Sequence, residues 1–320
     1  MTLPAFGLRY TVFADDAADA WPAVRRAALR AEADGFRTFW LMDHFMAMVA
    51  HGSQAMDPFL DAWTTLPAIA EATTTLRLGV LVSPVGYRNP TLLARQAATL
   101  DVISGGRLEF GFGAGGFRPE YEQYGFDFPP LPSTRIAQME EALRLIIDLW
   151  TKPRTTFKGE TFHAEDAILE PKPVQRPHPP ILIGGVGEKL VLRAIARFGA
   201  ACNLFGPPPE FRRVRGVLRG HCEAVGRDES TIRRTTYDLV LCAPTDAEVR
   251  AKADRLGLVR EPWKVLVGTP SQLRDLVGRY AEEGADELLV EVFRNDPESY
   301  ELFVGEVMSA FRPRLPPSSD

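Results

Sequence analysis

The stretch Pro180-Ile-Leu-Ile-Gly-Gly-Val-Gly-Glu188, which continues to Ala200-Ala-Cys-Asn-Leu-Phe205, organises the rest of the chain. Its first apolar run, 181–183, is ended by glycines and predicts a buried strand. Apolar residues then recur at helical spacing over 190–198, and Gly199 ends that helix before a second apolar run begins. The stretch therefore predicts a strand, a glycine turn, a helix and a second strand in close succession.

Three glycines, Gly184, Gly185 and Gly187, fall in the turn between this strand and this helix. Bare backbone N–H groups at the positive end of a helix can bind a phosphate. The alternative is that the glycines only shape a tight turn, but three of them within four residues favour an anion site. The turn is not a P-loop, because no Gly-Lys-Ser/Thr follows, and its spacing is not Gly-x-Gly-x-x-Gly.

The composition is that of a soluble globular protein. Of the 320 residues, 45% are hydrophobic and 25% are charged, and the net charge of −5 argues against nucleic acid or an anionic membrane as the main partner. The first ten residues lack a signal-peptide pattern, and no apolar stretch approaches the roughly 20 residues that span a bilayer. Cys202, Cys222 and Cys242 are spaced too widely for a metal knuckle, so we expect reduced thiols in a cytoplasmic protein.

The same alternation of strand and helix runs through the whole chain. Strands are predicted at 6–13, 38–42, 76–82, 107–113, 181–183, 200–205, 235–242 and 287–293. A helical pattern follows each of them; Asn89 and Ser133 are the expected N-caps of two of these helices, and 155–172 is expected to form a hairpin. Eight such units without a linker predict a single-domain (β/α)₈ barrel over 1–320, with 114–132 and 153–175 as insertions at its mouth. A doubly wound open sheet is the alternative, and the chain length favours the barrel.

Candidate catalytic residues follow from this barrel, because its site forms at the carboxyl ends of the strands. That rule selects 43–44, 82–84, 113–116, 183–187 and 203–205. His44 is the one histidine that directly follows a predicted strand, although a hydrogen-bonded structural histidine is an equal alternative.

Other kinds of active site have little support in the sequence. The chain has no His-x-His or His-Glu-x-x-His, so no metal site is expected. No lysine lies at a predicted strand end and no serine has a nucleophile elbow, which weakens the aldolase and hydrolase hypotheses. The aromatic segment 114–132 is expected to line a pocket because it is too irregular for a helix face, the alternative being a core under a long loop.

Six segments in order along the chain resemble one known family. They are Trp40-Leu-Met-Asp-His-Phe45, Leu76-Arg-Leu-Gly-Val-Leu-Val-Ser-Pro84 with Tyr87-Arg-Asn-Pro90, Leu100-Asp-Val-Ile-Ser-Gly-Gly-Arg107, Gly111-Phe-Gly-Ala-Gly115, Tyr124-Gly-Phe-Asp-Phe-Pro129 and Pro180-Ile-Leu-Ile-Gly-Gly185. The chain resembles the bacterial luciferase-like flavin and deazaflavin oxidoreductases, in particular their coenzyme F420-dependent branch. The resemblance covers nearly the whole chain.

The resemblance implies a cofactor, F420 or alternatively FMN, whose ring lies across the mouth of the barrel. A bulge on the third strand at about Val80-Leu81, often with a non-prolyl cis peptide, would support the ring, and the glycine turn would hold the phosphate. The cofactor-binding residues implied are Asp43, Val80, Leu81, Ser83, Gly113, Ala114, Ile183, Gly184, Gly185, Val186 and Gly187. A homodimer is also expected from the family.

The implied reaction is hydride transfer between the deazaflavin C5 and a small substrate. His44 would give or take the accompanying proton, and Asp43 would orient it or bond to the ring. The family's sugar-phosphate dehydrogenases carry a catalytic glutamate where this chain has Gly116, so an apolar or aromatic substrate is expected. The residues expected to line its pocket are Phe45, Phe117, Arg118 and Tyr121.

Three alternatives remain open at this point. They are an FMN-dependent monooxygenase on the same barrel, a flavin-binding protein without turnover, and a generic phosphate-binding barrel enzyme such as an isomerase. The roles of Arg118 and Glu120 also stay open: they are either solvated loop charges or contacts to the polar end of a substrate.

Overall fold

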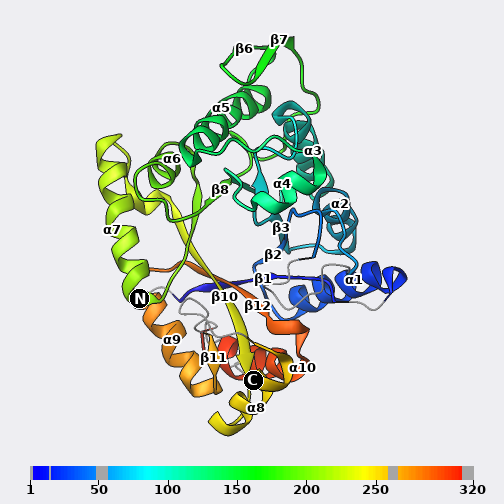
Figure 1. Cartoon of the computed structure of the whole chain (residues 1–320), viewed down its shortest axis with the longest axis vertical. Helices are drawn as coiled ribbons and strands as arrows, with labels where there is room; N and C mark the ends of the chain where they lie inside the picture. Colours follow the sequence, from blue (N-terminus) through cyan, green and yellow to red (C-terminus); the bar gives the residue numbers. More distant parts are fainter. Residues whose placement is uncertain (1–2, 14–15, 48–56, 259–265, 312–320) are drawn as a thin grey trace, which may run out of the picture.

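The computed structural model describes residues 3–13, 16–47, 57–258 and 266–311, and these form a closed parallel barrel (Figure 1). The barrel strands are β1 (Ala5–Arg9), β2 (Thr38–Leu41), β3 (Arg77–Val80), β5 (Leu108–Gly113), β8 (Ile181–Gly184), β9 (Ala201–Leu204), β10 (Arg233–Cys242) and β12 (Glu287–Val292). Each pairs in parallel with its neighbour in this order, and β12 pairs with β1 to close the ring. The predicted barrel and its eight strands are confirmed.

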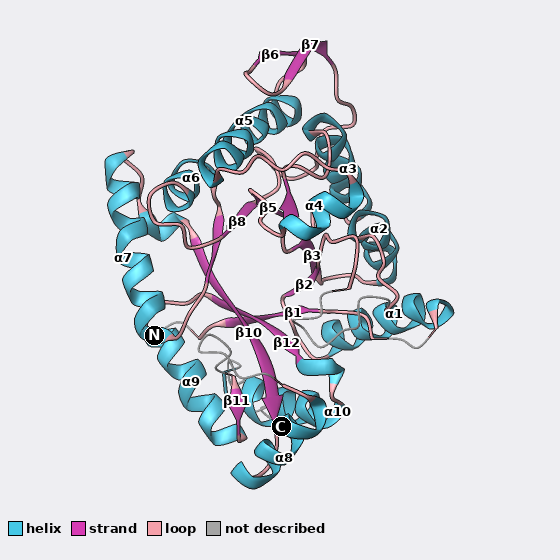
Figure 2. Cartoon of the chain, viewed as in Figure 1, coloured by secondary structure: helices cyan, strands magenta, loops and turns pink. Residues whose placement is uncertain are grey.

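Helices surround the strands, as Figure 2 shows. They are α1 (Ala17–Ala33), α2 (Ala62–Ala72), α3 (Pro90–Ile103), α4 (Arg118–Tyr124), α5 (Pro132–Thr151), α6 (Val191–Phe198), α7 (Pro208–Ala224), α8 (Asp246–Leu256), α9 (Pro270–Glu282) and α10 (Pro297–Leu302). Short strands β4 (Ser83–Pro84) and β11 (Val267–Gly268) extend the sheet beside β5 and β10. Most of the hydrophobic core lies where the helices pack on the outside of the barrel, and a smaller cluster that includes Trp40 and Leu182 fills its inside.

Of the two predicted N-caps, one is confirmed and one is wrong. Asn89 caps α3 as expected: its side chain accepts from the Thr91 backbone N–H, and Pro90 occupies the first turn. Ser133 is not the cap of α5. The helix begins at Pro132, so its N-cap is Leu131, two residues before the expected cap. Leu131 makes no side-chain hydrogen bond to the helix.

The hairpin predicted at 155–172 is present as β6 (Thr155–Lys158) and β7 (His163–Ala167), but it is not at the barrel mouth. It follows α5 and precedes β8, so it belongs to a helix-to-strand connection at the amino ends of the strands. Gln175, just after it, accepts from Arg77 and donates to the Leu108 carbonyl, where β3 and β5 begin. The expected mouth position of 153–175 is therefore wrong, whereas 114–132 follows β5 and does lie on the mouth side.

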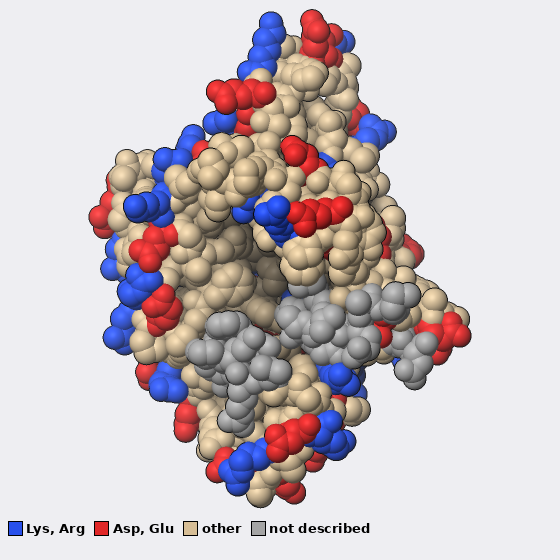
Figure 3. Space-filling view, viewed as in Figure 1, with Lys and Arg blue, Asp and Glu red and all other residues tan. Residues whose placement is uncertain are grey.

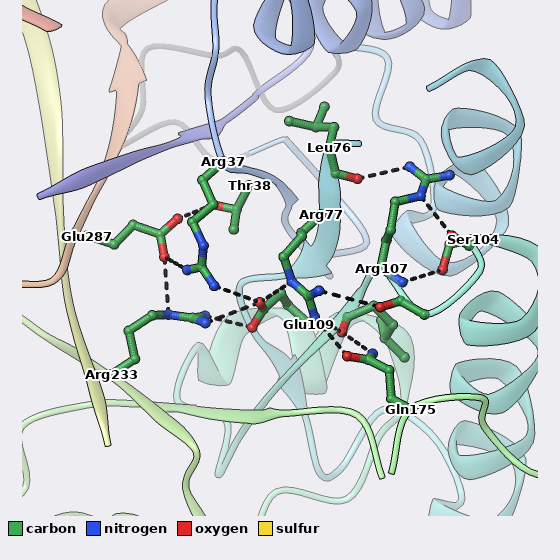
Figure 4. A network of polar contacts seen from close by, with 12 residues as sticks. Arg37, Thr38, Leu76, Arg77, Ser104, Arg107, Glu109, Gln175, Arg233 and Glu287 are labelled. Carbon is green, nitrogen blue, oxygen red and sulfur yellow. Dashed lines mark hydrogen bonds and ion pairs between the residues drawn. The ribbon is translucent and has the colours of Figure 1, made fainter. Parts of the chain in front are cut away.

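A buried ion network occupies that amino end (Figure 4). Glu109 of β5 accepts from Arg77 and Arg233 at 2.6 Å each. Glu287 of β12 accepts from Arg37 at 2.8 Å and forms an ion pair with Nε of Arg233 at 3.2 Å. Both carboxylates are almost fully buried. Burial by itself would raise the pKa of Glu109, but Arg233 and Arg77 outweigh it and the pKa lies below its usual range. In a barrel of this kind, such an end stabilises the fold while the opposite end carries the chemistry.

Candidate active site

His44 lies just beyond β2, and the side chain that holds it comes from α4. Its Nδ1 is 2.7 Å from Oε2 of Glu120, and the Glu120 side chain is fully buried while that of His44 is 21% exposed. Glu120 also accepts hydrogen bonds from the Tyr87 hydroxyl, the Phe45 backbone N–H and, at 3.2 Å, the Met46 backbone N–H. The carboxylate is thus bound from several sides and fixes the imidazole ring.

The electrostatics keep Glu120 charged. Burial alone would raise its pKa, but the hydrogen bonds from His44 and Tyr87 outweigh burial, and the pKa lies below its usual range. A carboxylate only accepts hydrogen bonds, so Nδ1 of His44 carries the proton in this pair. Nε2 is then the ring nitrogen that can exchange a proton with another molecule.

Asp43 has a different partner from the one expected. It is 2% exposed, and its Oδ2 lies 2.5 Å from Nη1 of Arg88, which also reaches Asp61 at 2.6 Å. Ser83 adds a further hydrogen bond. Burial raises the pKa of Asp43, and Arg88 opposes that rise. Among the described contacts, the partner of the His44 ring is Glu120 and that of Asp43 is Arg88, so Glu120 orients the ring; the alternative role of Asp43, a bond to the cofactor ring, stays a prediction.

Sequence reasoning left Glu120 open between a surface charge and a substrate contact, and it is neither. The available signal was three acidic residues, Glu120, Glu122 and Asp127, in a largely aromatic insertion, which does not by itself reveal that 118–124 folds as a helix against the segment after β2. Arg118, by contrast, is a surface charge: its side chain is 66% exposed and pairs with Glu122 one turn later. Arg118 is not among the residues that line the cavity described below, and its role toward a substrate stays a prediction.

The aromatic residues of the insertion form a cluster rather than a loose lining. Tyr121 is 1% exposed and packs against Tyr87 and Phe128, so it belongs to the core beneath the insertion. Phe45 is 39% exposed and contacts the same cluster through Tyr87. The Phe117 ring stands edge-on to the His44 ring, with 6.2 Å between the ring centroids. Of the four pocket candidates, Phe45 and Phe117 thus stay near His44, and Tyr121 does not line a surface.

The bulge expected on the third strand is present, one residue later than predicted. The cis peptide bond joins Leu81 to Val82 rather than Val80 to Leu81. Two glycines of β5 make room for this segment: a Cβ on Gly111 would overlap the Val80 carbonyl, and one on Gly113 would press on the Val82 side chain. Gly113 thus supports the bulge from behind.

The glycine turn after β8 is more open than the sequence suggested. Gly184 ends β8, Gly185 has a φ of 127°, and α6 begins only at Val191, whose N–H donates to the Gly187 carbonyl at 2.9 Å. Side chains at Gly185 or Gly187 would press against Val191. The turn therefore presents backbone without side chains, with Val186 37% exposed between the glycines.

A cavity of about 290 Å³ joins these elements across the barrel mouth. Its lining residues are Arg9, Leu81, Val82, Gly184, Gly185, Asn203, Phe205 and Tyr237. Figure 3 shows the hollowed face, whose visible walls are mostly uncharged. The structure thus brings together Leu81, Gly184 and Gly185 from the predicted cofactor set.

Other predicted cofactor residues are not in that wall. Val80 and Ile183 are fully buried, backbone included. Ser83 is buried and accepts from the Trp63 indole N–H at 2.7 Å. Ala114 packs against the core beyond the end of β5. The roles of these residues stay predictions.

Sequence reasoning missed the opposite wall of the cavity. Arg9 of β1 pairs with Glu291 of β12 at 2.6 Å and donates to the Tyr237 hydroxyl of β10. The Tyr237 hydroxyl in turn donates to Glu291 at 2.5 Å, and Thr11 also donates to Glu291. These residues are far apart in sequence and follow no motif, so only strand order brings them together.

The described residues offer neither a cluster of metal ligands nor a helix that could span a membrane. Within the described ranges, no group of three or more His, Cys, Asp or Glu side chains is placed to hold a metal ion. Among the helices in the same ranges, none is long and apolar enough to cross a bilayer.

Comparison with known proteins places this geometry in context. Residues 7–264 match the family model described as luciferase-like monooxygenase. An F420-dependent glucose-6-phosphate dehydrogenase of Kineococcus radiotolerans is 33% identical over 217 residues, which cover 65% of this chain and 60% of that protein. An FMNH(2)-dependent dimethylsulfone monooxygenase of Pseudomonas putida is 28% identical over 236 residues, covering 72% and 62%. The chain spans about half to two thirds of the length of the first curated relatives it matches.

A solved structure agrees on the fold over the full length. The coenzyme F420-dependent tetrahydromethanopterin reductase from Methanopyrus kandleri superposes with a TM-score of 0.78 and 18% identity, covering 98% of this chain and 100% of that chain. At this identity the similarity establishes the barrel alone.

Proposed function

Because the chain belongs to the luciferase-like monooxygenase family, whose relatives include F420-dependent and FMN-dependent enzymes, we propose that it is an F420-dependent oxidoreductase. It moves a hydride between the deazaflavin C5 and a small, largely apolar organic substrate. The observation that carries the proposal is the His44–Glu120 pair at the end of β2. The strand order supports a role for this pair at the cavity, because β2 lies between β1 and β3, which supply Arg9 and Leu81 to the cavity lining.

The residues of the cavity fit a flat ring with a phosphate-bearing tail. Leu81 and Val82 give an apolar wall without charge, as a ring face requires. Gly184 and Gly185 give a neighbouring wall of bare backbone that a phosphate can approach. When bound, the deazaflavin would supply the hydride acceptor or donor at C5.

The chain's own residues would position the substrate and transfer its proton. If an alcohol is oxidised at this site, Nε2 of His44 would take up its hydroxyl proton, and the bound cofactor would supply the acceptor for the hydrogen that leaves the carbon with both electrons. Glu120 holds the ring and stabilises the charge that His44 then carries. The apolar walls exclude water while the reacting carbons are held in contact. Gly116 leaves no side chain where the sugar-phosphate dehydrogenases of the family hold a glutamate, which supports a substrate other than a sugar phosphate.

The FMN-dependent monooxygenase is the second candidate, because an FMNH(2)-dependent relative matches the chain at 28% identity. The test compares the two reactions with one preparation. Under argon, purified protein should change the absorbance of F420 when given simple alcohols or, with reduced F420, ketones, and glucose 6-phosphate should not support turnover.

Oxygen consumption driven by reduced FMN, with no F420 turnover, would overturn the proposal in favour of a monooxygenase. A third outcome separates the non-catalytic alternative: F420 binding without turnover, equal in wild type and His44→Ala, would indicate a binding protein. Robust oxidation of glucose 6-phosphate would contradict the substrate class.

A further inference from the structure

The cavity has a second wall that the proposed cofactor site does not use. In the ring of eight strands, β10 lies four places from β3 in either direction, so Tyr237 stands across the barrel from the Leu81–Val82 segment. Arg9 on β1 and Tyr237 on β10 flank β12, which carries Glu291. If a ring rests on the Leu81–Val82 wall, this second wall faces the side on which a substrate would stack.

The charge on this second wall is balanced. Arg9 is the one charged side chain among the residues that line the cavity in the described part of the chain. Its charge is offset by Glu291, which is 1% exposed and only 2.6 Å away. The Tyr237 hydroxyl joins the two and keeps its proton, because burial raises its pKa well above the usual value. Within these three side chains the charges therefore cancel, while the carboxylate of Asp238, which also acts on Tyr237, adds negative charge nearby.

A wall of this kind selects its ligand by charge. An uncharged oxygen can accept a hydrogen bond from Arg9, or from the Tyr237 hydroxyl when that hydroxyl turns its one proton from Glu291 to the ligand, and in both cases Glu291 keeps its bonds from Arg9 and Thr11. A carboxylate or phosphate would meet a cation that is already paired and a buried carboxylate that repels it. Discrimination of this sort depends on the repulsive group as much as on the attractive one.

We propose that Arg9, Tyr237 and Glu291 form the subsite for the uncharged oxygen of the substrate, a ketone carbonyl or the matching hydroxyl, and that Glu291 excludes carboxylates and phosphates. The inference rests on the proposed function for the identity of the opposite wall. It names the substrate class that the same site takes: a small, uncharged carbonyl or alcohol.

The experiment measures binding of two probes of nearly equal shape, acetophenone and benzoate, by ligand-observed NMR titration. It is run on the F420-loaded protein and on the protein without cofactor. Acetophenone is expected to bind the wild type at least tenfold more tightly than benzoate. Tyr237→Phe should weaken acetophenone at least fivefold, and Glu291→Gln, which leaves the charge of Arg9 unbalanced, should tighten benzoate at least tenfold.

Two matched variants outside the mouth control for the chemical change itself. The Tyr300 hydroxyl donates to Asp34, and Glu301 pairs with Arg30 on the outer surface, so Tyr300→Phe and Glu301→Gln should leave both probe affinities unchanged. Melting temperatures of all variants establish that each is folded.

Equal affinity of the wild type for the two probes, binding of neither, or an unchanged ratio in Glu291→Gln would overturn the inference. If the proposed function fails, F420 does not bind. The ratio of the acetophenone and benzoate affinities, measured on the cofactor-free protein, then still decides the role of this wall.

Discussion

At the residue scale, the buried carboxylate of Glu120 converts a strand-end histidine into a directed proton carrier. A histidine after a strand is equally compatible with a structural role. The 2.7 Å contact to a charged, fully buried partner assigns Nδ1 to that partner and leaves Nε2 for exchange. Glu120 is a positioning residue in this account, because it acts through His44.

Replacing the two members of the pair should separate binding from turnover. We expect His44→Ala to lower kcat by about 10² to 10⁴-fold, the usual contribution of a positioned acid–base group. Glu120→Ala should lower it by roughly 10 to 100-fold, as removal of a residue that orients a functional histidine often does. F420 affinity should change little in either variant.

The control is Glu122→Ala, which removes an exposed glutamate two residues away that pairs only with the surface residue Arg118 in the described contacts. Glu120→Gln should also move the pH–rate profile, which a merely structural role would not do. Wild-type kcat and an unmoved profile in the Glu120 variants would contradict the assignment.

Sequence alone located His44 and the glycine turn but not their partners. A residue directly after a strand, or between a strand and a helix, is placed by local pattern. Glu120, Arg9, Tyr237 and Glu291 acquire their roles through contacts between distant segments, and nothing in their neighbours distinguishes them. The pairing of Asp43 with Arg88 is another contact of this kind.

At the element scale, β5 is shaped to support the β3 bulge. Gly111 and Gly113 stand where any side chain would strike the Val80–Val82 segment. The cavity wall at Leu81 and Val82 therefore depends on two glycines that never touch the cavity themselves. The local sequence predicted the strand, and the structure shows that its glycines leave room for the Val80–Val82 segment.

A pair of alanine substitutions tests this support. Gly111→Ala should destabilise the protein by at least about 1–3 kcal/mol, the usual range for overpacking, because the atom it meets is backbone. It should also weaken F420 binding by displacing the wall. Gly116→Ala adds the same methyl group where nothing lies within 4 Å, and should be close to neutral. Urea unfolding and F420 titration give both readouts, and equal behaviour of the two variants would refute the support role.

Elements were predicted better than their junctions. Strand and helix periodicity fixed the order of units, and Asn89-Pro90 marked one helix start correctly. Ser133 is not the N-cap because the helix already begins at Pro132, and proline is favoured in the first turn of a helix. The short α4 was missed because its surroundings are aromatic and irregular, and the burial of Glu120 depends on contacts with the segment after β2.

At the scale of the whole molecule, the two ends of the barrel divide stability from chemistry. Glu109 and Glu287 each meet several arginines at the amino end, far from the cavity at the carboxyl end. The eightfold alternation made the barrel predictable from the sequence. The ion network was not, since its members come from β3, β5, β10 and β12 and the start of β2.

Breaking this network should cost stability without changing catalysis. Glu109→Gln leaves Arg77 and Arg233 partly unpaired in a buried place, and we expect a loss of about 3–5 kcal/mol. Glu301→Gln breaks the exposed pair with Arg30 and should cost no more than about 1 kcal/mol. Denaturant unfolding measures the difference, and kcat of the folded Glu109→Gln protein should match wild type. Similar losses in the two variants would contradict the role of the network.

The same carboxylates predict an acid-sensitive fold. The folded pKa values of Glu109 and Glu120 lie below the usual one, so their stabilisation is complete above about pH 4.5 and is lost as the pH falls through the folded values. Burial raises the pKa of Glu287, which acts in the opposite direction and offsets part of the loss. Unfolding free energies at pH 7, 5 and 4 should fall between the last two, with a smaller fall in Glu109→Gln. Stability that rises below pH 5 would contradict this assignment.

The most direct test of the central claim is a binding titration of the purified protein with F420 and, separately, with FMN. The account predicts saturable F420 binding at least tenfold tighter than FMN binding, retained in His44→Ala and weakened in Gly111→Ala. Tighter binding of FMN, or binding of neither cofactor, would contradict it.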